Sequence, residues 1–436
     1  MASFVGFMKR SRILQHINRH PHVKFINTHH PHRDILVERI KAIPKLRYLA
    51  PTSGTYAINQ PFVFKLPSGT NRKLMKLGCY GEQANFGGSS GTLNSLGVIG
   101  FFRAWKYHQN NYDFLTYNRR DLYQFEYGIK GKNYREAIDK ICNTSNTTID
   151  VTDQKDMFPL VSFWDESQGL PLENIQNESI EIHADTVSNL NQYGTTTAGT
   201  VAAPTNVKLV LYMLEFENSV HHLKYLPEHH HKMGFYLHQA KKAHLFGEIN
   251  PYTHGFHRRT HLLENDKITV SHQAFVFPEE ILVNNTSTTG SQVVLEPTQR
   301  INKSISARCF YVYGLTTANI NYNFKTKTTA TQFDYVKFLT NTDENIKEYT
   351  QNPYYAGLFS YLFEHGDSPE NGLIYFSFDQ DDDEGHKIGN VMDLKGEQYN
   401  FKLAVTLTAG TTTAYIMVIA QHKITVSQKG DIIVSK

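Results

Sequence analysis

The side chains with the most potential for chemistry are histidines, and half of them fall in one segment. Eleven of the 22 lie between residues 221 and 272, among them the triplet at 229–231. Imidazoles bind zinc, copper, nickel or iron when two or three of them converge with a carboxylate. A cupin-type site needs two His and a Glu spaced along one strand. The triplet instead follows Pro227, and neighbouring residues of a strand face opposite sides. The segment therefore favours a structural or surface role, with a metal site as the alternative.

The acidic run at residues 379–384 resembles a calcium-binding loop in composition. An EF-hand loop needs Gly at its sixth position and Glu at its twelfth. Counted from Asp379, these positions hold Glu384 and Asn390, and no helices are predicted on either side. We therefore interpret 379–384 as a solvated turn between strands, with weak calcium binding or contact with a basic neighbour as alternatives.

The sequence lacks the common motifs of enzymes. It has no Gly-x-Ser-x-Gly elbow, no phosphate-binding Gly-x-x-x-x-Gly-Lys loop and no dinucleotide fingerprint after a strand. Its three cysteines (Cys79, Cys142 and Cys309) are far apart and odd in number. That pattern fits neither a disulfide framework nor a zinc site, and it indicates a reducing compartment. We predict no catalytic, cofactor-binding or metal-binding residue and expect that the chain is not an enzyme.

The composition predicts a folded chain rich in β-strands. Hydrophobic residues make up 40% and charged residues only 19%, which argues against disorder. The 25 Tyr and 27 Phe suit strands joined by polar turns. No run of about 18 apolar residues occurs, so no membrane-spanning helix is expected. At 436 residues the chain is too long for one core, and two domains are predicted.

Runs of alternating or apolar residues between turns predict the strands. The clearest is 399–408, where Tyr399, Phe401 and Leu403 alternate with polar or small residues. The other predicted strands are 62–66, 180–183, 208–216, 268–270, 274–277, 308–313, 320–325, 414–420 and 424–426. Helical patterns occur only at 132–142 and 352–364. Many short strands without interleaved helices predict an all-β sandwich fold with few short helices.

The predicted organisation is a basic arm followed by two jelly rolls. A boundary near residue 218 gives a first eight-stranded jelly roll at 48–218 and a second at 219–436. The arm, residues 1–47, carries ten Lys and Arg against two acidic residues, a net charge of +8. It is either a solvated tail or amphipathic start of the fold, or a basic segment lying against nucleic acid phosphates or a membrane surface.

Two stretches resemble a known family. Residues 158–164 form an apolar strand, 170–172 read Leu-Pro-Leu, and an alternating strand follows at 179–183. This order is similar to the end of the first jelly roll in the double-jelly-roll major capsid proteins of eukaryotic DNA viruses, the type found in large nucleocytoplasmic DNA viruses, virophages and polinton-like viruses.

The second stretch is 371–379 with the strands that follow it. It resembles the C-terminal end of the same family, which carries an Asn-Phe-Ser-Arg-x-Asp signature before its closing strands. Phe376, Ser377 and Asp379 match this signature, whereas Tyr375 and Phe378 stand where Asn and Arg are usual.

The resemblance implies a structural protein of an icosahedral virion. Each chain would fold as two jelly rolls standing side by side, and three chains would form a trimer of pseudo-sixfold outline that tiles the shell. The implied partners are copies of the chain itself, penton and minor capsid proteins, and genomic DNA or an internal membrane through residues 1–47. The protein would be made in the host cytoplasm or nucleus and would reside in the virion capsid.

Other protein classes share the jelly-roll architecture. A single-jelly-roll capsid protein would have the same function with one domain. A carbohydrate-binding sandwich protein would need exposed aromatic residues in a groove, and the sequence has only Trp105 and Trp164 as tryptophans. A metal-dependent, cupin-like enzyme would need the histidines of 221–272.

Overall fold

The fold is that of a computed structural model, which describes most of the chain after the basic arm. It covers residues 42–216 with short gaps, the strands between 267 and 316, most of 322–377, and the strands up to residue 435. The histidines between 221 and 261 lie outside the described residues, as does most of the arm. None of the helices that the structure describes is long and apolar enough to cross a membrane.

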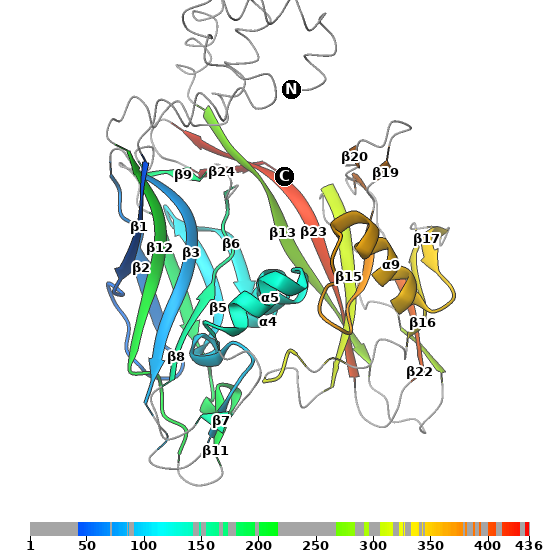
Figure 1. The fold of residues 1–436 in the computed structure, drawn as a ribbon, viewed down its shortest axis with the longest axis horizontal. Coiled ribbons are helices and arrows are strands. Elements are labelled where there is room, and N and C mark those ends of the chain that lie inside the picture. Colours follow the sequence, from blue (N-terminus) through cyan, green and yellow to red (C-terminus); the bar gives the residue numbers. More distant parts are fainter. Residues whose placement is uncertain are drawn as a thin grey trace, which may run out of the picture.

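The first half of the chain forms two antiparallel sheets with the strand order of a jelly roll (Figure 1). If its eight main strands are numbered along the chain, one sheet has the order 1-8-3-6 and the other 2-7-4-5. The 1-8-3-6 sheet contains β1 (Ala42–Leu49), β12 (Asn206–Phe216), β3 (Arg72–Gln83) and β8 (Gln154–Pro159). The 2-7-4-5 sheet contains β2 (Pro61–Lys65), β10 (Glu181–Thr186), β5 (Phe102–Gln109) and β6 (Tyr112–Asn118).

The second half repeats the same order with different strands. Its 1-8-3-6 sheet contains β13 (Lys267–Val283), β23 (Thr412–Ser427), β15 (Ser306–Thr316) and β18 (Ile374–Ser377). Its 2-7-4-5 sheet contains β14 (Gln292–Leu295), β22 (Asn400–Thr406), β16 (Phe333–Leu339) and β17 (Asn345–Tyr349). The predicted fold class, two consecutive eight-stranded jelly rolls, is therefore confirmed.

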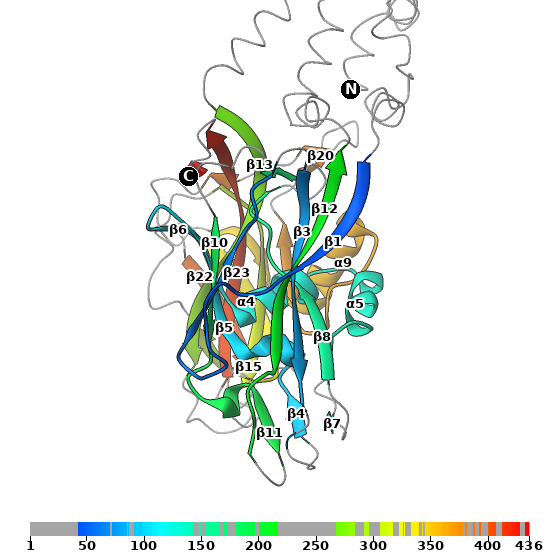
Figure 2. The same cartoon turned by 90° about the vertical axis from the view of Figure 1, so that its left-hand side faces the viewer.

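Short strands extend these sheets or form small sheets of their own. The first half adds β4 (Gly91–Leu93), β7 (Thr148–Ile149), β9 (Leu170–Pro171) and β11 (Gly194–Thr196). The second adds β19 (Gln380–Asp381), β20 (Lys387–Ile388), β21 (Met392–Asp393) and β24 (Ile432–Ser435). In Figure 2 the strands of the first jelly roll stand roughly parallel to the long axis of the sandwich.

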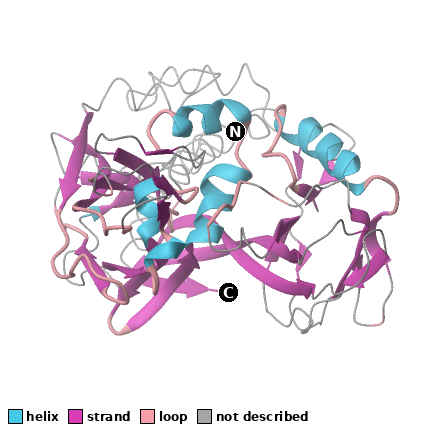
Figure 3. Cartoon of the chain, turned by 90° about the horizontal axis from the view of Figure 1, so that it is seen from below, coloured by secondary structure: helices cyan, strands magenta, loops and turns pink. Residues whose placement is uncertain are grey.

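In both jelly rolls a helical crossover joins the fifth and sixth main strands. In the first it consists of α4 (Arg119–Tyr123), a π-helical turn (Gln124–Gly128) and α5 (Lys132–Asp139). In the second it is α9 (Pro353–His365). The two predicted helices correspond to α5 and α9. Two short 3-10 turns (Gly97–Phe101 and Leu190–Gln192) complete the described helical structure. Figure 1 shows α4 and α5 between the jelly rolls and α9 alongside the second jelly roll, with β16 and β17 farther from the first. Figure 3 shows the same arrangement of helices and strands from below.

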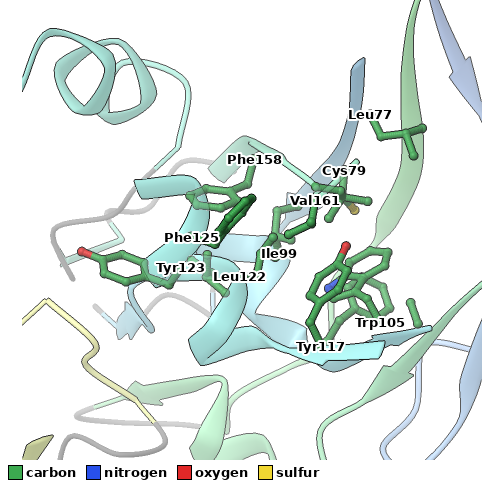
Figure 4. Close-up of a cluster of buried hydrophobic side chains, with 14 of the residues drawn as sticks. Leu77, Cys79, Ile99, Trp105, Tyr117, Leu122, Tyr123, Phe125, Phe158 and Val161 are labelled. Atoms are coloured by element: carbon green, nitrogen blue, oxygen red, sulfur yellow. The ribbon is translucent and has the colours of Figure 1, made fainter. Parts of the chain in front are cut away.

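The core of the first jelly roll is aromatic and fully enclosed. Trp105, Tyr107 and Phe163 have no exposed surface, and the rings of Tyr107 and Phe163 meet edge to face at 5.8 Å. The Tyr107 hydroxyl donates to the carbonyl oxygen of Val161 at 2.6 Å, so the ring is buried without leaving its polar end unsatisfied. Figure 4 shows that this core continues from the sheets to Leu122 and Tyr123 of α4.

Three details of the sequence prediction are corrected by the structure. β1 begins at Ala42, so the last six residues assigned to the basic arm form the first strand. The runs 268–270 and 274–277 belong to one strand, β13, in which Pro278 is tolerated because β13 pairs with β23 alone in the order of its sheet. The run 424–426 is part of β23, and the last strand is instead β24. The other boundaries of the predicted arm and jelly rolls remain a prediction.

Candidate functional site: the seam between the two jelly rolls

The described residues do not gather the histidines or acids into a site. No group of three or more His, Cys, Asp or Glu side chains in the described part of the chain is placed to hold a metal ion. Of the acidic run, Gln380–Asp381 pairs with Lys387–Ile388 as a short antiparallel ladder, and Asp379 and residues 382–384 lie outside the described residues. Trp105 and Trp164 are both fully buried, so neither tryptophan is available to stack on a sugar.

The most developed cluster of polar side chains lies where the jelly rolls meet. At its centre the Lys327 ammonium forms an ion pair with Glu370, and both side chains are more than nine-tenths buried. The Tyr123 hydroxyl, which comes from the first jelly roll, donates to the other carboxylate oxygen of Glu370 at 2.8 Å. Burial lowers the pKa of Lys327, and the Glu370 carboxylate offsets part of that effect. One carboxylate thus bridges the two halves of the chain.

Residues 322–325 reach across the seam and bind to the first jelly roll. The Tyr322 hydroxyl donates to the carbonyl oxygen of Thr92 at 2.7 Å, and the backbone N–H of Ser95 donates to the carbonyl oxygen of Tyr322 at 3.2 Å. The backbone N–H of Phe324 donates to the Ser95 hydroxyl at 3.0 Å, and its ring is buried against Tyr123. The sequence predicted a strand at 320–325. The alternation arises instead because Tyr322 and Phe324 turn toward the first jelly roll.

Two arginines of the first crossover are fixed at the seam, Arg120 against the second sheet and Arg119 against the first jelly roll. Asn118 and Asp121 form a capping box that fixes the start of α4. Arg120 places its guanidinium 3.8 Å from the ring centroid of Tyr415 on β23, a cation–π contact across the seam. Burial lowers the pKa of the neighbouring Arg119 to about 10. Arg119 Nη1 donates to the carbonyl oxygens of Gly100 at 3.1 Å and Gln192 at 3.0 Å.

Backbone carbonyl groups at the end of the irregular first crossover accept hydrogen bonds from the second jelly roll. The N–H of Glu370 donates to the carbonyl oxygen of Gly128 at 2.8 Å, and the Tyr361 hydroxyl of α9 donates to that of Ile129 at 2.6 Å. In the other direction, Arg135 Nη1 donates to the carbonyl oxygen of Ser368 at 2.8 Å. The end of the π-helical turn is therefore stabilised by groups more than 200 residues away in the sequence.

The buried side chains of the second 1-8-3-6 sheet divide between two cores. Tyr311, Tyr313 and Tyr415 belong to the hydrophobic cluster that fills the first jelly roll. Phe310 is buried outside that cluster and packs against Phe338 of β16, with ring centroids 5.5 Å apart. Because successive strand residues face opposite sides, the outward face of this sheet packs on the first jelly roll and the inward face fills its own sandwich.

The C-terminal end of the chain is also tied to the first jelly roll. The backbone N–H of Ile432 on β24 donates to Gln109 Oε1, at the end of β5, at 2.8 Å. Such contacts have no periodic pattern, so they could not be predicted from spacing along the chain. The partners of the central cluster, Tyr123 and Glu370, are 247 positions apart.

These features define the chain as a double jelly roll whose halves are joined by a buried seam of apolar and charged contacts. No protein-family model and no curated protein matches the sequence. Solved structures do share the fold. One is the PBCV-1 virus capsid, with a TM-score of 0.61 and 9% identity over 91% of this chain and 97% of that one.

Two further matches have the same architecture. The Faustovirus major capsid protein gives a TM-score of 0.52 at 8% identity, covering 96% of this chain and 98% of that chain. The Sputnik virophage structure gives 0.53 at 10% identity, covering 90% and 88%. The match spans both jelly rolls in each case, so the chain has the complete double-jelly-roll fold of these capsid proteins.

Proposed function

We propose that this chain is a major capsid protein, a building block of an icosahedral virus shell with a structural role and no catalytic one. The observation that carries the proposal is the seam. Two complete jelly rolls are held as one block by a buried ion pair, a cation–π contact and an inserted segment, as a shell subunit under load requires. The likeness to capsid proteins over nearly the whole length supports the same assignment.

In this proposal three copies form a capsomer of pseudo-sixfold outline, and capsomers tile the shell of the virion. Jelly rolls hide most strand edges inside the sandwich and offer flat lateral faces for repeated contact. Penton and minor capsid proteins would complete the shell at positions that the trimer does not fill.

The test is the assembly state of the purified protein, measured by light scattering and viewed by negative-stain microscopy. Particles with the mass of three chains and a hexagonal outline, or fragments of shell, are the expected result. A stable monomer at all concentrations would contradict the proposal and would direct attention to glycan binding and metal content.

The basic arm, residues 1–47 apart from the part in β1, is proposed to lie on the inner side of the shell. Its charge suits contact with genomic DNA or with an internal membrane bearing anionic lipids. Deleting residues 1–30 should impair assembly or packaging. A variant with the same length but with Lys9, Arg10, Arg12, Arg19 and Lys24 changed to Gln separates charge from chain length. Unchanged particles from both variants would refute this role.

A further inference from the structure

The turn that begins at Glu370 also carries the single Asn-Gly dipeptide of the sequence, Asn371-Gly372. The backbone N–H of Leu373 donates to the carbonyl oxygen of Glu370 at 3.4 Å, which closes a four-residue β-turn. Gly372 is the third residue of this turn and has a φ of +92°, as the glycine position of a type II turn requires. The dipeptide therefore directly follows the central carboxylate residue of the seam.

Asn371 is the accessible residue of this turn. It is exposed, whereas Glu370 before it and Leu373 after it are buried. Within the described part of the chain, neither the Asn371 side chain nor the Gly372 N–H takes part in a hydrogen bond. The bond that closes the turn is longer than the usual N–H···O distance of about 2.7–3.2 Å. The Asn371 amide can therefore rotate toward the Gly372 nitrogen without breaking a hydrogen bond of its own.

The same turn supports the buried ion pair. A Cβ at Gly372 would lie 2.7 Å from the Cβ of Lys327 and 3.1 Å from its Cδ, so the lysine stem packs directly on this glycine. The Lys327 ammonium pairs with Glu370, and the backbone N–H of Glu370 donates to the carbonyl oxygen of Gly128 at 2.8 Å. One turn thus holds the ion pair, the lysine stem and a bond to the first jelly roll. A change in the length of its backbone would disturb all three.

We propose that Asn371 is a site of spontaneous covalent modification through which the seam loosens with time. The backbone nitrogen of Gly372 attacks Cγ of Asn371, and glycine favours this attack because it has no Cβ to block the approach. The new N–Cγ bond closes a succinimide ring, the Cγ–Nδ2 bond breaks, and the proton of the attacking nitrogen leaves with the amide group as ammonia. Water then opens the ring, at Cγ to give aspartate or at the main-chain carbonyl carbon to give isoaspartate.

Both products change the surroundings of Glu370. Each adds a carboxylate next to a carboxylate that Lys327 already neutralises, so like charges repel across the turn. In isoaspartate the main chain also runs through Cγ, which lengthens the turn by one backbone atom and shifts Glu370 relative to Gly372. A buried ion pair depends on accurate geometry, so this shift weakens the contact between the jelly rolls. The inference is independent of the capsid proposal, because it needs only the folded chain.

The experiment incubates the folded wild-type chain at pH 8.5 and 37 °C beside the control variant Asn371→Gln. Glutamine keeps a neutral amide at this exposed position, but its longer side chain would have to close a larger and less favourable ring. Peptide mass spectrometry measures the gain of one dalton at residue 371, and electron-transfer fragmentation distinguishes aspartate from isoaspartate. We expect residue 371 to be converted faster than any other asparagine of the chain, and the variant to remain unmodified at this position.

Hydrogen exchange then measures the effect on the seam. Modified and unmodified chains are separated by ion exchange, and exchange is compared in the peptide that contains the Glu370 N–H. Exchange of this group should rise about two- to tenfold in the modified chain, the effect of losing roughly one hydrogen bond. Freshly prepared Asn371→Asp shows the effect of charge alone. The chain that carries isoaspartate should exchange faster than this variant, because only isoaspartate lengthens the turn.

Two results would overturn the inference. Conversion of residue 371 no faster than that of the other asparagines is one, and a parallel incubation in urea then shows whether the folded turn prevents the reaction. Conversion that leaves the exchange of the Glu370 N–H unchanged is the other, because the modification would then not reach the seam. Neither result affects the capsid proposal, which is tested by the assembly state of the unmodified chain.

Discussion

Replacing Lys327 by Met should lower the free energy of unfolding by more than the loss of a surface ion pair would. Lys327 is 1% exposed and Glu370 8%, so Lys327→Met leaves a buried carboxylate whose remaining partners include the Tyr123 hydroxyl. Removing one member of a buried pair costs about 3–5 kcal/mol, because the other charge remains in a medium of low polarity. The free energy of unfolding, measured by urea denaturation at pH 7.5, should fall by that amount.

Two further variants separate the charge from the packing. The double variant Lys327→Met/Glu370→Gln removes both charges and keeps an acceptor for Tyr123, so it should recover at least half of the loss. The matched surface pair is Lys337 and Glu348, 3.0 Å apart and partly exposed. Lys337→Met should cost less than about 1 kcal/mol. A loss of under 1 kcal/mol for Lys327→Met, or a double variant no more stable than the single one, would refute the reasoning.

Two other perturbations test the seam and the exposed helix. Burial raises the pKa of Asp121 from 3.8 to about 6, so the folded chain binds this proton more tightly than the unfolded chain and the group's contribution to stability falls as the pH rises from about 4 to 6. Asp121→Asn should remove about 2 kcal/mol of the difference in the free energy of unfolding between pH 4.5 and 7.5, measured by urea denaturation, and an unchanged pH profile would contradict this. Gly357→Ala should lower the free energy of unfolding by about 1–3 kcal/mol although Ala favours helices, because a Cβ at Gly357 would lie 2.7 Å from the backbone nitrogen of Tyr375. A higher melting temperature for the variant would contradict this and would show that the helix moves to make room for the methyl group.

Local patterns predicted the elements because they record which face of each strand is buried. The alternation at 399–408 corresponds to β22, and the apolar run at 208–216 lies within β12, the central strand beside β1 and β3. The seam could not be predicted in the same way. Its members are paired by the fold rather than by spacing, and Lys327 was one of 44 basic residues with nothing in its surroundings to mark it. Apolar and polar residues do alternate at one part of the seam, residues 320–325, but this alternation has the period of a strand and led to the incorrect prediction of one.

The two halves share a strand order without a visible sequence repeat, and the chemistry of their contacts differs accordingly. Within the chain the halves meet in one covalently linked arrangement, and charged groups such as Lys327 and Glu370 are buried there. A buried ion pair adds little net stability. If the two jelly rolls packed in another relative position, however, each charge would be buried without its partner, so the pair favours one arrangement of the two halves. In the proposed capsomer the exposed surfaces would have to be soluble alone and then associate, and they include Phe359 and Phe363 on α9, which are 62% and 75% exposed. Aromatic residues suit that requirement, because Tyr and Phe bury a large apolar area on binding a partner and carry no charge whose desolvation would oppose binding. A capsid subunit built this way would be rigid within each chain and reversible between chains.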